Sequence, residues 1–228
     1  MGREEIFRVR HQSIPALGES AREDGIINLF GAQVVTDLYT QLLLSGLCFH
    51  MQTGTEDAPS TTNTTVDDIK CIMVADNNAG VMMPLFADVN IATFAAVTNI
   101  EGMLEVDMDK KRYTSGGTVF VPEQMNNAAT DAAAANGTFY TIEGSDIVAA
   151  AKSAVPASVE LARRTFTEDA VADPAGAMMA RSPLFSVRTQ IPVLGNTPSS
   201  IVVHLGGSAD FTGYASLDFA QFSASLAW

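Results

Sequence analysis

The chain has 228 residues, of which 47% are hydrophobic, 17% charged and 7% aromatic. This length and apolar fraction suit one large all-β domain or two small domains with a sizeable core, and they exclude global disorder. The net charge is −13, from 26 acidic residues against 13 lysines and arginines. Such a surface repels nucleic acid, and it favours solubility and tolerates salt because screening weakens self-repulsion.

The first 24 residues mix charges of both signs and are interrupted by Pro15 and Gly18, which predicts an extended arm outside the core. Four arginines and five acidic residues lie in this arm, so it lacks the basic excess of a genome-packaging arm. We find neither the apolar segment of a signal peptide nor an apolar run of membrane-spanning length. We therefore expect synthesis in a cytoplasm and no secretion by a cleaved leader.

Residues 25–53 are rich in β-branched and large apolar side chains. They predict two consecutive strands, with a helix over Val34–Leu44 as the alternative. A polar Thr/Ser/Asp loop follows at 53–68. The next apolar run ends at Asn77–Gly80, where Asn and Gly predict a hairpin turn because both tolerate a positive φ angle.

Short β-like segments then continue to Val121, and an Ala-rich loop with a helical turn is expected at 126–137. Ser145 and Asp146 are candidate caps of a short helix that Pro156 would end. The next segment fits a strand or a helix, and we favour a strand, followed by a small-residue connection at 168–182. The predicted closing strands have the sequences LFSVRTQIPV, SSIVVHLGG and GYASLDFAQFSASLAW.

This pattern amounts to about nine to twelve short strands, with turns every eight to fifteen residues or so. It predicts an all-β, antiparallel β-sandwich, barrel or jelly roll, because parallel βαβ units would show regular helical patterns between the strands. We expect a single jelly-roll-like domain with long loops over residues 25–228, preceded by the arm at 1–24. Cys48 and Cys71 are expected as buried thiols, with a disulfide between neighbouring strands as the alternative.

Three histidines are present, and none has a second metal ligand at the usual spacing. His11 lies in the arm, whereas His50 and His204 lie in apolar runs and are expected in the core or at an interface. Ser208 and Asp210 follow His204 closely, but no nucleophile-elbow motif accompanies them.

Two clusters of polar residues are candidate calcium ligands. Asp107 and Asp109 share a strand face, but Lys111 and Arg112 stand where an EF-hand loop needs Asp or Asn and then Gly. Asp76 and the two following Asn residues could hold Ca²⁺, but a turn explains them better.

The basic clusters Lys110–Arg112 and Arg163–Arg164 are too short for a nucleic-acid patch. We interpret them as solvated turns or inter-subunit salt bridges. The sequence thus predicts no catalytic, cofactor-binding or metal-ligating residue, and a protein that is not an enzyme.

The ten methionines and twelve phenylalanines are dispersed among the strands, and adaptable methionines suit surfaces that pack in several similar ways. Together with the arm before Gly25, the strand series from Ile26 to Val121 and the three closing strands, this texture resembles the single jelly-roll capsid proteins of icosahedral viruses. It is similar in style to those of membrane-containing viruses of thermophilic bacteria and haloarchaea.

This resemblance implies a viral structural protein that self-assembles, with copies of itself and with other capsid proteins, into the shell of a virion in the host cytoplasm. It also implies an internal membrane nearby, no cofactor, no small-molecule substrate and no direct binding of nucleic acid. Two other classes remain open. One is a β-sandwich binding module, such as a fibre head, an adhesin or a carbohydrate-binding domain; the other is an enzyme on a double-stranded β-helix scaffold, which three scattered histidines disfavour.

Overall fold

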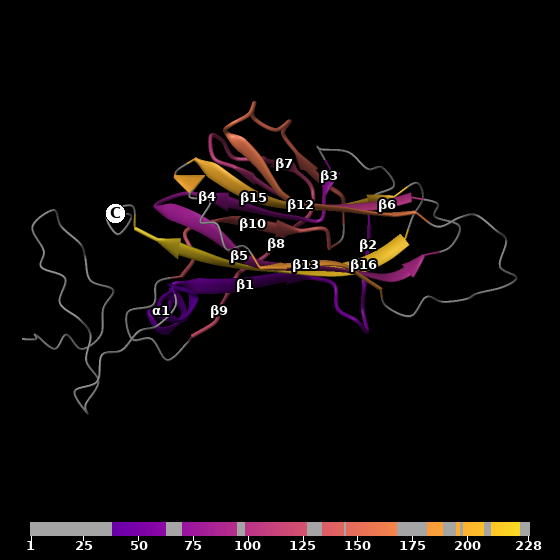
Figure 1. Ribbon diagram of the computed structural model, residues 1–228, viewed down its shortest axis with the longest axis horizontal. Helices are drawn as coiled ribbons and strands as arrows, with labels where there is room; N and C mark the ends of the chain where they lie inside the picture. Colours follow the sequence, from indigo (N-terminus) through magenta and orange to yellow (C-terminus); the bar gives the residue numbers. More distant parts are fainter. Residues whose placement is uncertain are drawn as a thin grey trace, which may run out of the picture.

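Two antiparallel β-sheets packed face to face form the body of the molecule, with a short helix and a small third sheet outside them (Figure 1). The computed structural model describes residues 38–62, 70–94, 99–126, 134–143, 145–167, 182–188, 195–196, 198–207 and 211–223. The predicted arm at 1–24 lies outside these residues.

Eight strands of the described residues form the framework of the two main sheets, which contain seven and six strands in all. They are β1 (Cys48–Thr53), β4 (Met73–Asn77), β5 (Val81–Phe94), β6 (Asn99–Asp107), β12 (Ser158–Thr167), β13 (Ser182–Arg188), β15 (Ser199–Gly207) and β16 (Phe211–Phe222). One sheet has the order β13-β5-β16-β1, and the other has the order β12-β6-β15-β4.

The pairing of these eight strands is nested. The first pairs with the last (β1 with β16) and the second with the next to last (β4 with β15), and the inner pairs are β5 with β13 and β6 with β12. This connectivity arises when one long antiparallel hairpin folds back on itself. Successive strand pairs then alternate between the two sheets. This is the connectivity of a jelly roll. The predicted all-β jelly-roll sandwich is therefore confirmed.

Shorter strands extend this framework, and most of them lie in the long connection between β6 and β12. β10 (Gly137–Thr141) and β8 (Thr118–Val119) continue the second sheet beyond β4, and β9 (Glu123–Gln124) continues the first sheet beyond β1. β2 (Ser60–Thr61) pairs with β16, and β14 (Gly195–Asn196) pairs with β5. The third sheet contains β3 (Lys70–Cys71), β11 (Ile147–Ala149) and β7 (Tyr113–Ser115).

The main core lies between the two sheets. Along β15, Ile201, Val203 and Leu205 face this core because alternate side chains of a strand point to one side. At its centre, the ring of Phe219 stacks on Phe49 and Phe139, with ring centroids 5.7 and 5.4 Å away. Dense aromatic packing here ties the two sheets together.

Each outer face of the sandwich is partly covered by another element. Val74 and Val202, on the outer side of the second sheet, pack with Ile147 of the small sheet. The helix α1 (Leu38–Leu44) covers part of the first sheet, where Leu42 packs with Leu85. Several strand residues are consequently buried on both faces, and all nine residues of β15 are buried.

Two predictions of secondary-structure type were wrong. In the described part of residues 25–53, the chain forms α1 where we favoured a strand, because Tyr39, Leu42 and Leu43 fall on one helical face that packs against the first sheet. The predicted helix after Ser145 is strand β11, because pairing with β3 and β7 outweighs the helix propensity of its alanines.

A turn forms at Asn77–Gly80 as predicted, but the predicted hairpin is wrong, because β4 and β5 on its two sides lie in different sheets. The Asn77 side chain accepts a hydrogen bond from the backbone N–H of Ala79 and donates one to the carbonyl of Gly80. Gly80 has a φ angle of 73°, and an added Cβ would lie 2.3 Å from the carbonyl oxygen of Phe222. Only glycine therefore fits this turn without displacing the end of β16.

The sandwich ends in two lateral edges on opposite sides. At one edge, β12 and β13 are the outermost strands of the two sheets and lie against each other. At the other, residues 118–126 cross from β8 in the second sheet to β9 in the first. We call these surfaces the β12–β13 edge and the β8–β9 edge.

The variant F219A is expected to lose about 3–5 kcal/mol of unfolding free energy, because it leaves a cavity between the stacked rings of Phe49 and Phe139. Urea unfolding followed by circular dichroism measures this loss. The matched control is V155A, whose side chain is 86% exposed and whose stability should change by less than about 0.5 kcal/mol. Equal stability of the two variants would contradict the packing described above.

Candidate functional site

A row of polar side chains lies on the outer face of the second sheet, beneath the long β6–β12 connection. Strand alternation sets this row: Leu104 and Val106 of β6 face the core, so Glu105 and Asp107 face outward. Both carboxylates are nevertheless buried, with exposed fractions of 1% and 0%. Charged groups so deeply buried require partners.

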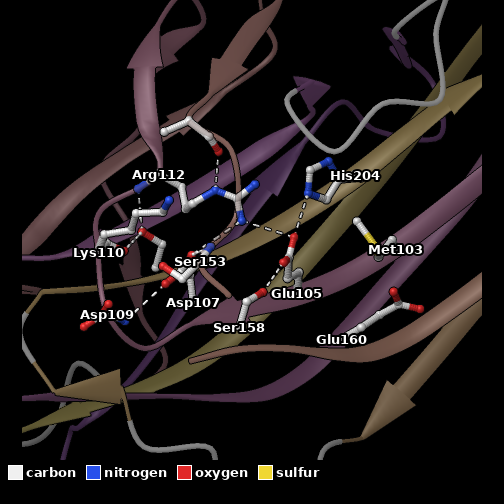
Figure 2. A network of polar contacts seen from close by, with 12 residues as sticks. Met103, Glu105, Asp107, Asp109, Lys110, Arg112, Ser153, Ser158, Glu160 and His204 are labelled. Atoms are coloured by element: carbon white, nitrogen blue, oxygen red, sulfur yellow. Dashed lines mark hydrogen bonds and ion pairs between the residues drawn. The ribbon is translucent and has the colours of Figure 1, made fainter. Parts of the chain in front are cut away.

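Arg112 supplies the opposite charge. Its guanidinium reaches down from the β6–β12 connection, and the residue is 0% exposed. Nη1 lies 3.2 Å from Glu105 Oε2 and 3.8 Å from Asp107 Oδ2, and Nε donates a hydrogen bond to the Ala150 carbonyl (Figure 2). One buried cation thus lies between two carboxylates of the same strand.

The backbone around Arg112 is held as firmly as its side chain. Its N–H donates to Ser200 Oγ at 2.8 Å and to Asp76 Oδ1 at 3.0 Å. The other oxygen of Asp76 accepts from the N–H of Tyr113 at 3.2 Å. Next to it, the Tyr113 ring stacks on Tyr140 of β10 with a centroid separation of 3.5 Å. Strands β4, β10 and β15 therefore fix the point where the connection crosses the sheet.

Asp107 fixes two further points of the same connection. Oδ1 accepts from the N–H of Asp109, and Oδ2 accepts from the N–H of Ser153 at 2.8 Å. These two donors lie near opposite ends of the insertion, so one carboxylate ties its entry to its exit. The prediction that Asp107 and Asp109 share a strand face is wrong, because β6 ends at Asp107 and Asp109 lies in the following bend. The Asp107 side chain stabilises this bend by accepting the Asp109 N–H.

His204 closes the network on the β15 side. Its Nδ1 lies 2.6 Å from the carbonyl oxygen of Lys70, and because a carbonyl only accepts, Nδ1 carries a hydrogen. Its Nε2 lies 3.6 Å from Glu105 Oε2. The residue is 5% exposed, so His204 lies within the fold.

The electrostatics of Glu105 follow from these neighbours. Burial raises the pKa of the carboxyl, but the neighbouring His204, the hydrogen bond from Ser158 and the charge of Arg112 outweigh burial. Together they hold the pKa at about 2, below the ordinary 4.5. Glu105 is therefore ionised over the whole physiological range.

This network joins distant parts of the same chain to one another. The carboxylates form ion pairs with Arg112, and they accept hydrogen bonds from Ser158 and from backbone N–H groups of the connection. The network can therefore fix the long β6–β12 connection to the outer face of the second sheet. The prediction that Lys110–Arg112 forms a solvated turn or an inter-subunit bridge is wrong for Arg112, because the two carboxylates beneath it attract it inward.

The remaining candidates lie apart from this network. His50 Nδ1 lies 2.6 Å from Asp218 Oδ1, across β1 and β16. That hydrogen bond raises the pKa of His50 above its ordinary value, against the opposing effect of burial. Cys48 and Cys71 are buried free thiols on different sheets, so the disulfide alternative is wrong. Burial raises the pKa of both thiols, to about 12 for Cys48.

His11, Ser208 and Asp210 lie outside the described residues. Across the ranges that are described, no group of three or more His, Cys, Asp or Glu side chains is placed to hold a metal ion. The helix found there, α1, is seven residues long, and no helix in those ranges is long and apolar enough to cross a membrane.

Comparisons with protein-family models, with curated proteins and with solved structures find no match to this chain. Sequence reasoning missed the role of Glu105 and the burial of Arg112. A signal for both was present: two acidic residues at alternate positions of an apolar strand, near a basic residue in a chain that has few.

The variant R112M is expected to lose about 3–5 kcal/mol of unfolding free energy, because it leaves Glu105 and Asp107 buried without a cation. Urea unfolding measures the loss. The control R164M changes an exposed arginine and should stay within about 0.5 kcal/mol of wild type. If R112M matched R164M, the buried ion network would not stabilise the fold.

The pH dependence of E105Q tests the low pKa of Glu105. A carboxyl with a lowered pKa in the folded state stabilises the fold above its unfolded pKa, and this stabilisation is lost as the pH falls through the folded pKa. Wild type should therefore lose stability between pH 4.5 and about 2 more steeply than E105Q. The variant E143Q, at an exposed position, is the control and should keep the wild-type slope; equal slopes in E105Q and wild type would contradict the assignment.

Proposed function

We propose that this chain is a structural subunit that assembles with copies of itself, as the capsid protein of an icosahedral virus. The observation that carries the proposal is the distribution of exposed apolar side chains. Five large hydrophobic residues are exposed among those described, and three of them, Val119, Val121 and Met125, lie on the β8–β9 edge. A fourth, Leu44, ends α1, and its carbonyl accepts a hydrogen bond from Asn126 of the same edge.

Apolar residues gathered on one exposed surface are typical of a protein–protein contact. The jelly-roll fold supports the proposal by analogy, because capsid subunits, lectins and cupins share this architecture. Among these classes, an apolar lateral edge favours the one whose members pack side by side.

The acidic charge fits the same proposal. A shell of subunits with a net charge of −13 leaves the genome to an inner layer or a membrane, and we expect no direct binding of nucleic acid. The proposed partners are copies of the chain and other capsid proteins. The proposed location is the virion, after assembly in the host cytoplasm.

Assembly should depend on salt. At low ionic strength the acidic subunits repel one another, and at molar salt the repulsion is screened over a few ångströms. Light scattering with negative-stain imaging should therefore show a monomer or small oligomer at low salt and rings, sheets or shells of uniform size at molar salt. Dialysis back to low salt is the control, because ordered assemblies should disassemble and aggregates should not. If the protein stayed a monomer or a lone trimer at every salt concentration, the proposal would be contradicted, and a fibre head or another binding module would be favoured.

A further inference from the structure

The β8–β9 edge is an apolar strip that spans both sheets. At one end Val119 pairs with Tyr140 of the second sheet, and at the other Glu123 pairs with His50 of the first. Between them Phe120 packs against the core, and the alternate positions face outward. The exposed fractions are 65% for Val119, 79% for Val121 and 37% for Met125.

The charge of this edge is negative. Residues 118–126 contain one charged side chain, the exposed Glu123, and no lysine or arginine. A second acid lies beside the strip: Glu143 is exposed, and its carbonyl accepts a hydrogen bond from the Thr118 hydroxyl. A partner for this edge must therefore offer apolar surface together with positive charge.

The opposite edge of the same molecule carries exposed arginines, whose stems are apolar and whose guanidinium groups are positive. The described residues contain four arginines; Arg112 is buried, and the other three are exposed on β12 and β13. These three are Arg163, Arg164 and Arg188. The described lysines, by contrast, lie outside both edges, at positions 70, 110, 111 and 152.

Arginine suits an interface better than lysine does. Its long stem covers apolar surface while its planar guanidinium binds carboxylates, and interfaces are enriched in arginine and depleted of lysine. Arg163 is already oriented by ion pairs with Glu101 and Glu160. Arg188 lies over the ring of Tyr39, 5.8 Å from its centroid. Two of the three arginines are thus held in place on their own subunit.

We propose that the β12–β13 edge of one copy of this chain docks against the β8–β9 edge of a second copy. This inference rests on the proposed self-assembly and names the surfaces that make it. The two edges lie on opposite sides of one sandwich, so the contact joins unlike surfaces. Each copy keeps one free edge, and the pair therefore keeps one of each kind, so that repetition of the contact builds a ring or an extended array.

The test uses two single variants, V121D on one edge and R164E on the other, at the lowest salt at which wild type associates. Each places a carboxylate in the contact and should raise the dissociation constant by at least about tenfold, so that each variant sediments as a monomer. A mixture of the two should form a one-to-one dimer, because V121D keeps a wild-type β12–β13 edge and R164E keeps a wild-type β8–β9 edge. Sedimentation velocity measures all three samples.

Matched controls make the same chemical changes elsewhere. V155D alters an exposed valine outside both edges, and K111E reverses an exposed charge outside both edges. Both should associate like wild type. Circular dichroism of all four variants should equal that of wild type, since each altered side chain is exposed.

The outcomes separate this inference from the proposed function. Association of both edge variants like wild type would overturn the docking surfaces and leave self-assembly standing. Loss of association in V121D alone would replace the contact by one between two β8–β9 edges, and a monomeric mixture would overturn head-to-tail docking. Complementation in the mixture, with wild type forming only small rings, would support the surfaces and overturn the icosahedral shell. A wild type that stays monomeric at every salt concentration would overturn both.

Discussion

The burial of one positive charge constrains much of this structure. Arg112 lies between Glu105 and Asp107 with no exposure to solvent, and a guanidinium is stable there only because both carboxylates are fixed on a rigid strand. The long connection that carries Arg112 must then follow one path across the sheet. Its backbone is also held by Asp76 and Ser200. The network therefore orders a long connection into a fixed layer on the sheet.

That fixed layer determines which surfaces remain open. The β6–β12 connection places β7 and β11 on the outer face of the second sheet, and it places β8 and β9 at one lateral edge. On the other face, α1 covers part of the first sheet. The two lateral edges consequently differ in chemistry: one is built from the insertion and is apolar and acidic, and the other is built from the main strands and carries arginines.

The fold class follows from the sequence more readily than the site does. The closing strands and the turn at Asn77–Gly80 follow from local sequence patterns. The composition of SSIVVHLGG alone predicts a buried strand, and all nine of its residues are buried. The errors at α1 and β11 arise where a short segment satisfies two periodicities and a distant partner decides between them. Arg112 could not be placed from sequence, because its partners in β4, β6 and β15 come together only through the nested pairing. The apolar strip at Val119 and Val121 looked like any other strand.

The nested pairing also determines when during synthesis the sandwich becomes complete. β16 is synthesised after the other described strands, yet it lies at the centre of its sheet between β1 and β5, and its residue Asp218 bonds His50 across 168 positions of the chain. Until β16 has been made and has joined the sheet, β1 and β5 each expose an unpaired edge and an uncovered apolar face. Contacts so distant in sequence also make closure slow. Newly made chains must therefore be kept apart for longer than those of a helical protein of equal size.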